Sequence, residues 1–248
     1  ISLPVTRRQN RFASALCVLA LAAAPAVAQT VLPRSAEPFV GTIGTTHADS
    51  TPAFPAPVTA PVGAPNVVLV LTDDVGFGAA STFGGSIPTP HLDQLAEEGL
   101  RFNRFHTTAM CSPTRASLLT GRNHHAVGNG IVANLSTGFP GYNNLMPRSA
   151  ASIAEVLRQN GYNTAMFCKH HNAPEAHVSA AGPFDMWPTG LGFEYFFGFM
   201  AAETNQFTPA LYRGITPVPT LEEGVLDKAL ADDAIHWVKT RDALAPAQ

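Results

Sequence analysis

The chain has 248 residues, of which 46% are apolar and 13% are charged, and its formal net charge is −3. These values exclude a disordered tail, which would hold fewer apolar residues and more net charge. They also argue against a nucleic-acid-binding protein, which is usually basic. Three cysteines are too few for a disulfide scaffold. The composition therefore indicates a globular protein of one large or two small domains.

Residues 1–28 are predicted to be a signal peptide. Arg7, Arg8 and Arg11 precede an uncharged stretch over 12–24, and Ala-Val-Ala over 26–28 supplies the small residues of a cleavage site. No stretch of the chain reaches the roughly 20 apolar residues that a membrane-spanning helix needs. We therefore expect a periplasmic or secreted protein with no membrane span after signal removal. The loss of three arginines and no acid lowers the formal charge to −6.

A lead-in rich in Pro, Ala, Thr and Gly covers 29–64. Such a composition predicts an extended segment without a packed core of its own. From residue 66 the pattern changes, because 67–71 reads Val-Val-Leu-Val-Leu. An unbroken run of this kind is typical of a central strand that is buried on both faces of a parallel sheet.

Helices and strands are predicted to alternate along the rest of the chain. Glycines at 99 and 161 end two of the helices. The alternation indicates an α/β fold. The aromatic run over 193–199 is expected to serve packing rather than to form a substrate platform. Helices are expected over 90–99, 149–160 and 227–240, and strands over 100–105 and 162–167.

Asp73 and Asp74 directly follow the first predicted strand. The carboxyl ends of strands are where α/β sheets bind ligands, and two adjacent carboxylates repel each other unless a positive group lies between them. A hard divalent cation such as calcium meets this need, because it prefers oxygen ligands. A solvated acidic pair at the start of a turn explains the same residues, and from this pair alone both interpretations stay open.

Cys111 is predicted to lie at the N-terminus of a helix. Pro113 suits the first turn of that helix and Gly121 suits its end. Backbone N–H groups and the helix dipole favour an anion at this end, so Cys111 is a candidate thiolate with Arg115 one turn further on. A small buried hydrophobic residue is the alternative interpretation of Cys111.

Lys169 and His171 follow the strand predicted over 162–167. They are therefore expected at the same edge of the sheet as the two aspartates. A cation and an imidazole at this place suit an anionic group held near a metal. A positively charged surface turn is the alternative interpretation of these residues.

Taken together, these residues resemble the signature of the type I sulfatases. The motif is Cys-Ser-Pro-Thr-Arg over 111–115, and it continues into Thr-Gly-Arg over 120–122. The resemblance extends from about Pro65 to Leu244. It implies a mixed, mainly parallel sheet flanked by helices, as in the alkaline-phosphatase-like superfamily. The family also has Lys-x-His after a strand, but it usually has glycine where this chain has Cys168. Further similar segments are 66–74, 88–93, 121–125 and 182–206.

In the type I sulfatases, a maturation enzyme oxidises the cysteine of the motif to formylglycine. The hydrated aldehyde then supplies the hydroxyl that attacks the sulfur of a small-molecule sulfate ester, and its second hydroxyl allows sulfate to be expelled. The resemblance therefore implies that Asp73, Asp74 and the modified Cys111 bind one calcium ion, and that Cys111 is also the nucleophile. By motif position, Arg115 stabilises the hydrate and Lys169 balances the negative charge of the sulfate. His171 transfers a proton at position 111.

Members of this family are considerably longer, and they supply a further His, an Asp-Asn pair and another Lys beyond the region that matches. Two aspartates and one modified residue leave calcium short of its about six to eight oxygens. We therefore expect residues 65–248 to be the N-terminal part of a sulfatase catalytic domain, truncated at the C-terminus. The alternatives to a sulfuric ester hydrolase are a phosphonate or phosphate monoester hydrolase of the same superfamily and a catalytically inactive remnant.

Overall fold

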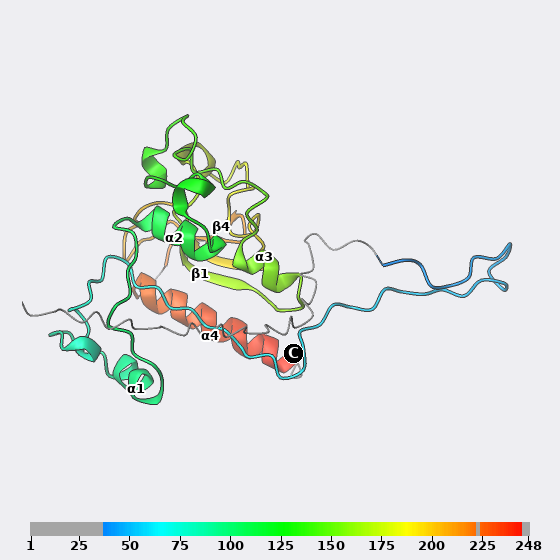
Figure 1. The fold of residues 1–248 in the computed structure, drawn as a ribbon, viewed down its shortest axis with the longest axis horizontal. Coiled ribbons are helices and arrows are strands. Elements are labelled where there is room, and N and C mark those ends of the chain that lie inside the picture. The colour runs from blue at the N-terminus through cyan, green and yellow to red at the C-terminus, as the bar shows by residue number, and fades with distance from the viewer. Residues whose placement is uncertain (1–36, 222–223, 245–248) are drawn as a thin grey trace, which may run out of the picture. The chain divides into compact units, whose positions relative to one another are not determined.

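The structure is a computed structural model that describes residues 37–221 and 224–244. The signal peptide predicted over 1–28 lies outside the described residues. Residues 37–64 run as a long extended loop, in which Thr42 and Thr51 form an isolated bridge (Figure 1). Among the described residues, no helix combines the length and the apolar character needed to cross a membrane.

A four-stranded mixed sheet forms the centre of the described fold, in the order β1-β2-β3-β4. The longest ladder is the parallel pairing of β1 with β2, which aligns Ala165 with Tyr195 and Lys169 with Phe199. The pairings of β2 with β3 and of β3 with β4 are antiparallel and cover two residue pairs each. The strands are β1 (Ala165–Lys169), β2 (Tyr195–Phe199), β3 (Tyr212–Arg213) and β4 (Thr216–Pro217).

Four α-helices and four 3-10 helices accompany this sheet in the described part of the chain. The α-helices are α1 (Pro90–Glu98), α2 (Cys111–Thr120), α3 (Ile153–Arg158) and α4 (Leu226–Leu244). The 3-10 helices are η1 (Ser81–Phe83), η2 (His124–Val127), η3 (Ala133–Leu135) and η4 (Glu175–His177).

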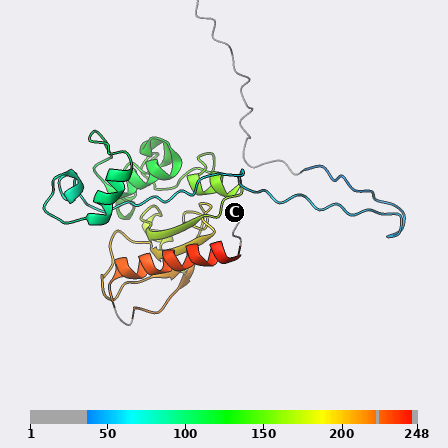
Figure 2. The same cartoon turned by 90° about the horizontal axis from the view of Figure 1, so that it is seen from below.

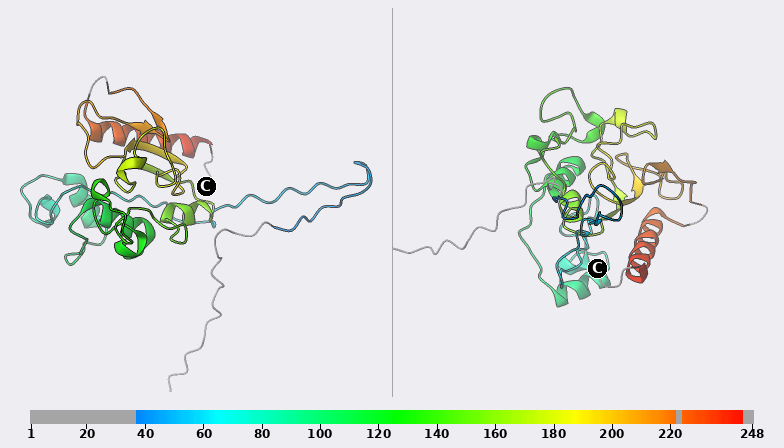
Figure 3. Two further views of the ribbon diagram at one scale, coloured as in Figure 1. Left: turned by 90° about the horizontal axis from the view of Figure 1, so that it is seen from above. Right: turned by 90° about the vertical axis from the view of Figure 1, so that its right-hand side faces the viewer.

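The side chains of β2 pack on both faces of the sheet. Phe196 belongs to a buried cluster with Trp187 and residues of α2, and both aromatic rings are 0% exposed. Phe197 and Phe199 belong to a second cluster with Leu226 at the start of α4. The long helix α4 accordingly lies along one face of β1 and β2, and α2 and α3 lie on the other side (Figures 2 and 3). The aromatic run thus serves packing, as expected, and forms a strand.

The predicted helices and one predicted strand are confirmed with shifted ends. The helix α2 ends at Gly121, whose φ of 64° is in the left-handed region that glycine adopts readily. The helix α3 starts later than predicted, because the Ser152 side chain accepts a hydrogen bond from the Glu155 N–H and caps it there. The strand predicted over 162–167 is β1, displaced toward the C-terminus.

The strand predicted over 67–71 is wrong for this structure. The segment forms no strand, and Val68 is 83% exposed. Before the segment, Thr59 lies close to Gly161, which precedes β1: a Cβ added to Gly161 would be 2.2 Å from the Thr59 carbonyl carbon. After the segment, Asp73 forms an ion pair with Lys169 at the end of β1. The segment therefore runs beside β1 in the same direction without pairing. An apolar run favours burial, but a strand forms only where a partner backbone lies in register.

The strand predicted over 100–105 is also wrong for this structure. These residues are irregular, with Leu100 at 86% and Phe105 at 78% exposure. The helix α1 before them shows its apolar face to solvent as well, since Leu95 is 66% exposed. The periodicity was sufficient to predict α1, because a helix satisfies its own backbone hydrogen bonds, whereas a strand depends on a neighbour.

Candidate active site

Lys169, at the end of β1, contacts both Asp73 and the motif cysteine. Its ammonium nitrogen Nζ is 2.6 Å from Oδ2 of Asp73 and 3.4 Å from Sγ of Cys111. The Lys169 side chain is 8% exposed and that of Asp73 is 41% exposed. The fold therefore brings together residues that are 96 and 58 positions apart in the chain.

Arg115 reaches the same place from the second turn of α2. Its Nη2 donates to Oδ1 of Asp73 at 3.2 Å, and its Nη1 donates to the main-chain oxygen of Lys169 at 2.8 Å. Because the Arg115 side chain is only 7% exposed, Asp73 balances two nearly buried cations. Burial raises the pKa of Asp73, but the hydrogen bonds and charges of Lys169 and Arg115 outweigh burial, so the pKa lies below its ordinary value.

Asp73, Asp74 and Cys111 offer a group of possible metal ligands. One ligand atom from each residue lies within 4.8 Å of the others. The two carboxylates fit a hard cation such as calcium. The thiol of Cys111 is a soft ligand, so this position fits the same cation only after conversion to an oxygen-bearing residue. The two aspartates therefore fit the predicted calcium ion as they stand. Residue 111 fits it only in the modified form.

Ser112 joins three segments around the motif cysteine, a role that its place in the sequence does not indicate. Its Oγ donates to the main-chain oxygen of His171 at 2.6 Å and accepts from the N–H of Ala133 at 2.9 Å. Its main-chain oxygen accepts from the side-chain amide of Asn172 at 2.8 Å. Ser112 is 0% exposed. These contacts hold the residue next to Cys111 against the loop that carries His171.

His171 is held by a side chain that lies far from it in the chain. Its Nε2 is 3.0 Å from Oδ1 of Asn134, in η3. Burial and then the charges of Lys169 and Arg115 lower the pKa of His171 to about 4, so the ring is neutral near neutral pH. Its other nitrogen, Nδ1, is buried and has no hydrogen-bond partner among the described residues. Nothing in the local sequence pattern around Asn134 indicates this contact.

Cys168, which stands where the resemblance implies glycine, fits beside Arg115. Its Sγ lies 4.0 Å from Nη1 of Arg115 and donates to the main-chain oxygen of Lys169 at 3.0 Å. Burial raises the pKa of this thiol to about 11, which keeps it protonated near neutral pH. The side chain therefore leaves the contacts of Arg115 with Asp73 intact.

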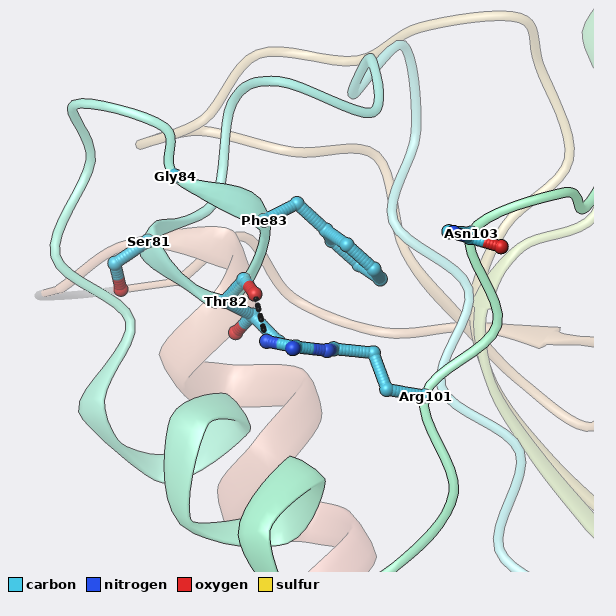
Figure 4. A pocket seen from close by; sticks show the side chains of 6 residues that line it. All are labelled: Ser81, Thr82, Phe83, Gly84, Arg101 and Asn103. Carbon is cyan, nitrogen blue, oxygen red and sulfur yellow. Dashed lines mark hydrogen bonds between the residues drawn. The ribbon is translucent and has the colours of Figure 1, made fainter.

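An open hollow of about 490 Å³ lies next to η1, apart from these residues (Figure 4). Arg101 points into it and donates from Nη1 to the main-chain oxygen of Thr82 at 2.9 Å. None of the predicted site residues lines this hollow. Its lining consists of Ser81, Thr82, Phe83, Gly84, Arg101 and Asn103.

The mixed sheet, its flanking helices and a cluster of acids and cations at one strand end define an α/β protein with a candidate site for an anion beside a metal. Residues 65–246 match the Sulfatase family, and the chain belongs to that family. The resemblance seen in the sequence is thereby confirmed.

Curated relatives support the same family, and a solved structure supports the fold. The chain is 34% identical over 180 residues to the Arylsulfatase of Klebsiella aerogenes, a match that covers 72% of this chain and 34% of the relative. It is 38% identical over 157 residues to Arylsulfatase G of Mus musculus, a match that covers 62% of this chain and 27% of the relative. The solved structure of Ps i-CgsB is similar in fold, with a TM-score of 0.58 at 24% identity over 71% of this chain and 41% of that chain. The matches span roughly a quarter to a third of the curated relatives.

Proposed function

We propose that this sulfatase-family chain contributes the nucleophile and anion-binding half of a site that hydrolyses sulfate monoesters. The observation that carries the proposal is the position of Lys169, whose ammonium group lies within 3.4 Å of Cys111 Sγ and 2.6 Å of Asp73. A buried cation next to the motif cysteine suits a sulfate group that approaches residue 111.

The family resemblance suggests a role for each residue of the cluster, and the contacts of Lys169 and Arg115 support theirs. A formylglycine made from Cys111 by a maturation enzyme would supply the attacking hydroxyl. Lys169 would bind a sulfate oxygen, because its nitrogen already contacts both Cys111 and Asp73. Arg115 keeps Lys169 and Asp73 in place through its two hydrogen bonds and supplies positive charge near residue 111. His171, neutral near neutral pH, would accept a proton from residue 111.

A calcium ion is proposed to bind to Asp73, Asp74 and the modified residue 111. When bound, the ion would draw charge from the sulfate oxygens. The carboxylate of Asp73 also contacts two cations, so the ion would share this ligand with Lys169 and Arg115. Asp74 has no ion pair among the described residues, and its carboxylate is therefore the more available of the two.

The modification and the activity can be tested on the same preparation. The full chain is co-expressed with a formylglycine-generating enzyme, and the peptide that contains residue 111 is analysed by mass spectrometry. Hydrolysis of an aryl sulfate and of the matching aryl phosphate is then measured, with Cys111→Ala as the control. We expect the aldehyde at residue 111 and hydrolysis of the sulfate that the control lacks.

The other outcomes identify the alternatives. A thiol that persists despite a competent maturation enzyme contradicts the formylglycine proposal. Preference for the phosphate ester indicates a phosphate or phosphonate monoester hydrolase. A verified aldehyde without turnover of either ester indicates that this chain is catalytically inactive.

We also propose that the protein is exported to the periplasm or the medium. N-terminal sequencing of the exported protein should then begin at Gln29.

A further inference from the structure

We propose that Asn134 is a positioning residue that holds His171 as the tautomer protonated at Nε2, so that Nδ1 keeps the lone pair that accepts a proton. The inference deepens the proposed function, because that function gives His171 a proton-transfer role. Its observational basis is the contact of 3.0 Å between Oδ1 of Asn134 and Nε2 of His171.

The tautomer follows from the chemistry of the two atoms. A carboxamide oxygen has lone pairs and no hydrogen, so it can only accept a hydrogen bond. The nitrogen Nε2 of His171 must therefore carry the proton. A neutral imidazole has one N–H, which leaves Nδ1 without a proton and able to accept one. This Nδ1 is buried without a partner among the described residues.

The backbones of both partners are fixed by the same hydroxyl group. Ser112 Oγ accepts from the N–H of Ala133, the residue before Asn134, and donates to the main-chain oxygen of His171. His171 also has a φ of 49°, a left-handed conformation that is uncommon for a residue with a side chain. The anchoring explains how Asn134 and His171 meet, although they are 37 positions apart and Asn134 is itself exposed.

The charged groups around the His171 ring keep it neutral, and the contact with Asn134 then determines which nitrogen carries the proton. Lys169 and Arg115 are positive and disfavour a second proton on the ring, whereas Asp73 acts in the opposite direction more weakly. The ring is therefore neutral near neutral pH, and one proton must reside on either Nδ1 or Nε2. Asn134 is the described side chain that hydrogen-bonds to either nitrogen, so it decides between the two.

The test is a measurement of histidine tautomers in the full chain labelled with 15N-histidine. Two-bond 1H–15N correlation spectra distinguish a protonated ring nitrogen from a bare one. In the unchanged chain we expect His171 to show a protonated Nε2 and a bare Nδ1. In Asn134→Ala we expect this pattern to be lost in favour of a mixture of tautomers. In Asn134→Asp the acceptor is kept and carries a negative charge, so Nε2 stays protonated and the pKa of His171 rises.

Two controls separate this effect from a general disturbance. His170 is an internal control, because its Nε2 lies 2.6 Å from the main-chain oxygen of Met186 and its pattern should not change. Asn103→Ala is the matched variant, since it removes the same amide from an exposed position that lines the hollow of Figure 4. We expect the His171 pattern to survive in this control.

The proposal is overturned if His171 of the unchanged chain is protonated at Nδ1, or if Asn134→Ala leaves its tautomer unchanged. If the alanine variant also loses the His170 pattern and so is unfolded, Asn134→Asp decides, and an unchanged His171 pKa there overturns the proposal. The spectra require neither metal, modification nor turnover. An inactive chain with the predicted pattern would thus contradict the proposed function and leave this inference standing.

Discussion

Replacing Asp73 with asparagine removes the anion that two nearly buried cations share. Lys169 and Arg115 are 8% and 7% exposed at their side chains and lie 2.6 and 3.2 Å from the Asp73 oxygens. An asparagine keeps the shape of the side chain and one acceptor oxygen, but it turns an N–H group toward the second cation. We therefore expect Asp73→Asn to destabilise the fold while leaving its packing intact.

The size of the effect follows from the exposure of the three groups. Breaking a fully buried ion pair costs about 3–5 kcal/mol, whereas an exposed pair contributes about 0–1 kcal/mol. Asp73 is 41% exposed, so in the variant water can solvate the two cations where the carboxylate stood. This solvation offsets part of the free energy lost with the ion pairs. We expect Asp73→Asn to lower the free energy of unfolding by about 1–3 kcal/mol, between these limits.

Asp74→Asn is the matched control, because it is the same substitution at the next residue. Asp74 has no ion pair among the described residues, and its φ of 53° is a conformation that asparagine tolerates well. We expect it to change the free energy of unfolding by less than about 0.5 kcal/mol. The assay is urea denaturation of both variants with a chelator, followed by calcium titration, in which both variants should bind calcium more weakly than the unchanged chain.

Equal destabilisation by the two substitutions, or none by Asp73→Asn, would refute this account of the site. The pH dependence provides a second check. The folded-state pKa of Asp73 lies below its unfolded value of about 3.9. Its stabilisation is therefore complete above that value and is lost as the pH falls through the folded-state pKa. The stabilities of the unchanged chain and Asp73→Asn should converge in acid.

Three further predictions concern the stability of the fold. Burial lowers the pKa of His170 and His171 to about 4. The unfolded chain then binds more protons below about pH 6.5, so stability falls from there toward pH 4, and replacing both by glutamine should flatten this part of the denaturation–pH profile. Ser152→Ala removes the 3.0 Å cap on the Glu155 N–H and should cost about 1 kcal/mol in urea denaturation. Val68→Lys should cost less than about 0.5 kcal/mol, since Val68 is 83% exposed. A loss of several kcal/mol in the same assay would instead indicate the buried strand first predicted there.

The helix that carries the motif could be predicted because its limits are local. A proline suits the first turn of α2, and Gly121 adopts the left-handed conformation at its end. The same holds for the position of Lys169 at the end of a strand, which places it at the edge where such sheets bind ligands. The run over 67–71 failed as a strand prediction, because pairing depends on the register of another segment and not on the run itself.

The contacts that orient the candidate site could not be predicted, because they join distant segments through loops. Ser112 and His171 are 59 positions apart, and Asn134 and His171 are 37 apart. Each contact depends on the paths of the chain on both sides of β1, with the short helix that carries Asn134 before the strand and the left-handed His171 after it. A motif specifies which groups take part in the chemistry, whereas the hydrogen bonds of Ser112 and Asn134 decide where the ring of His171 stands and which of its nitrogens is bare. Those two residues are therefore where the structure adds most to the motif.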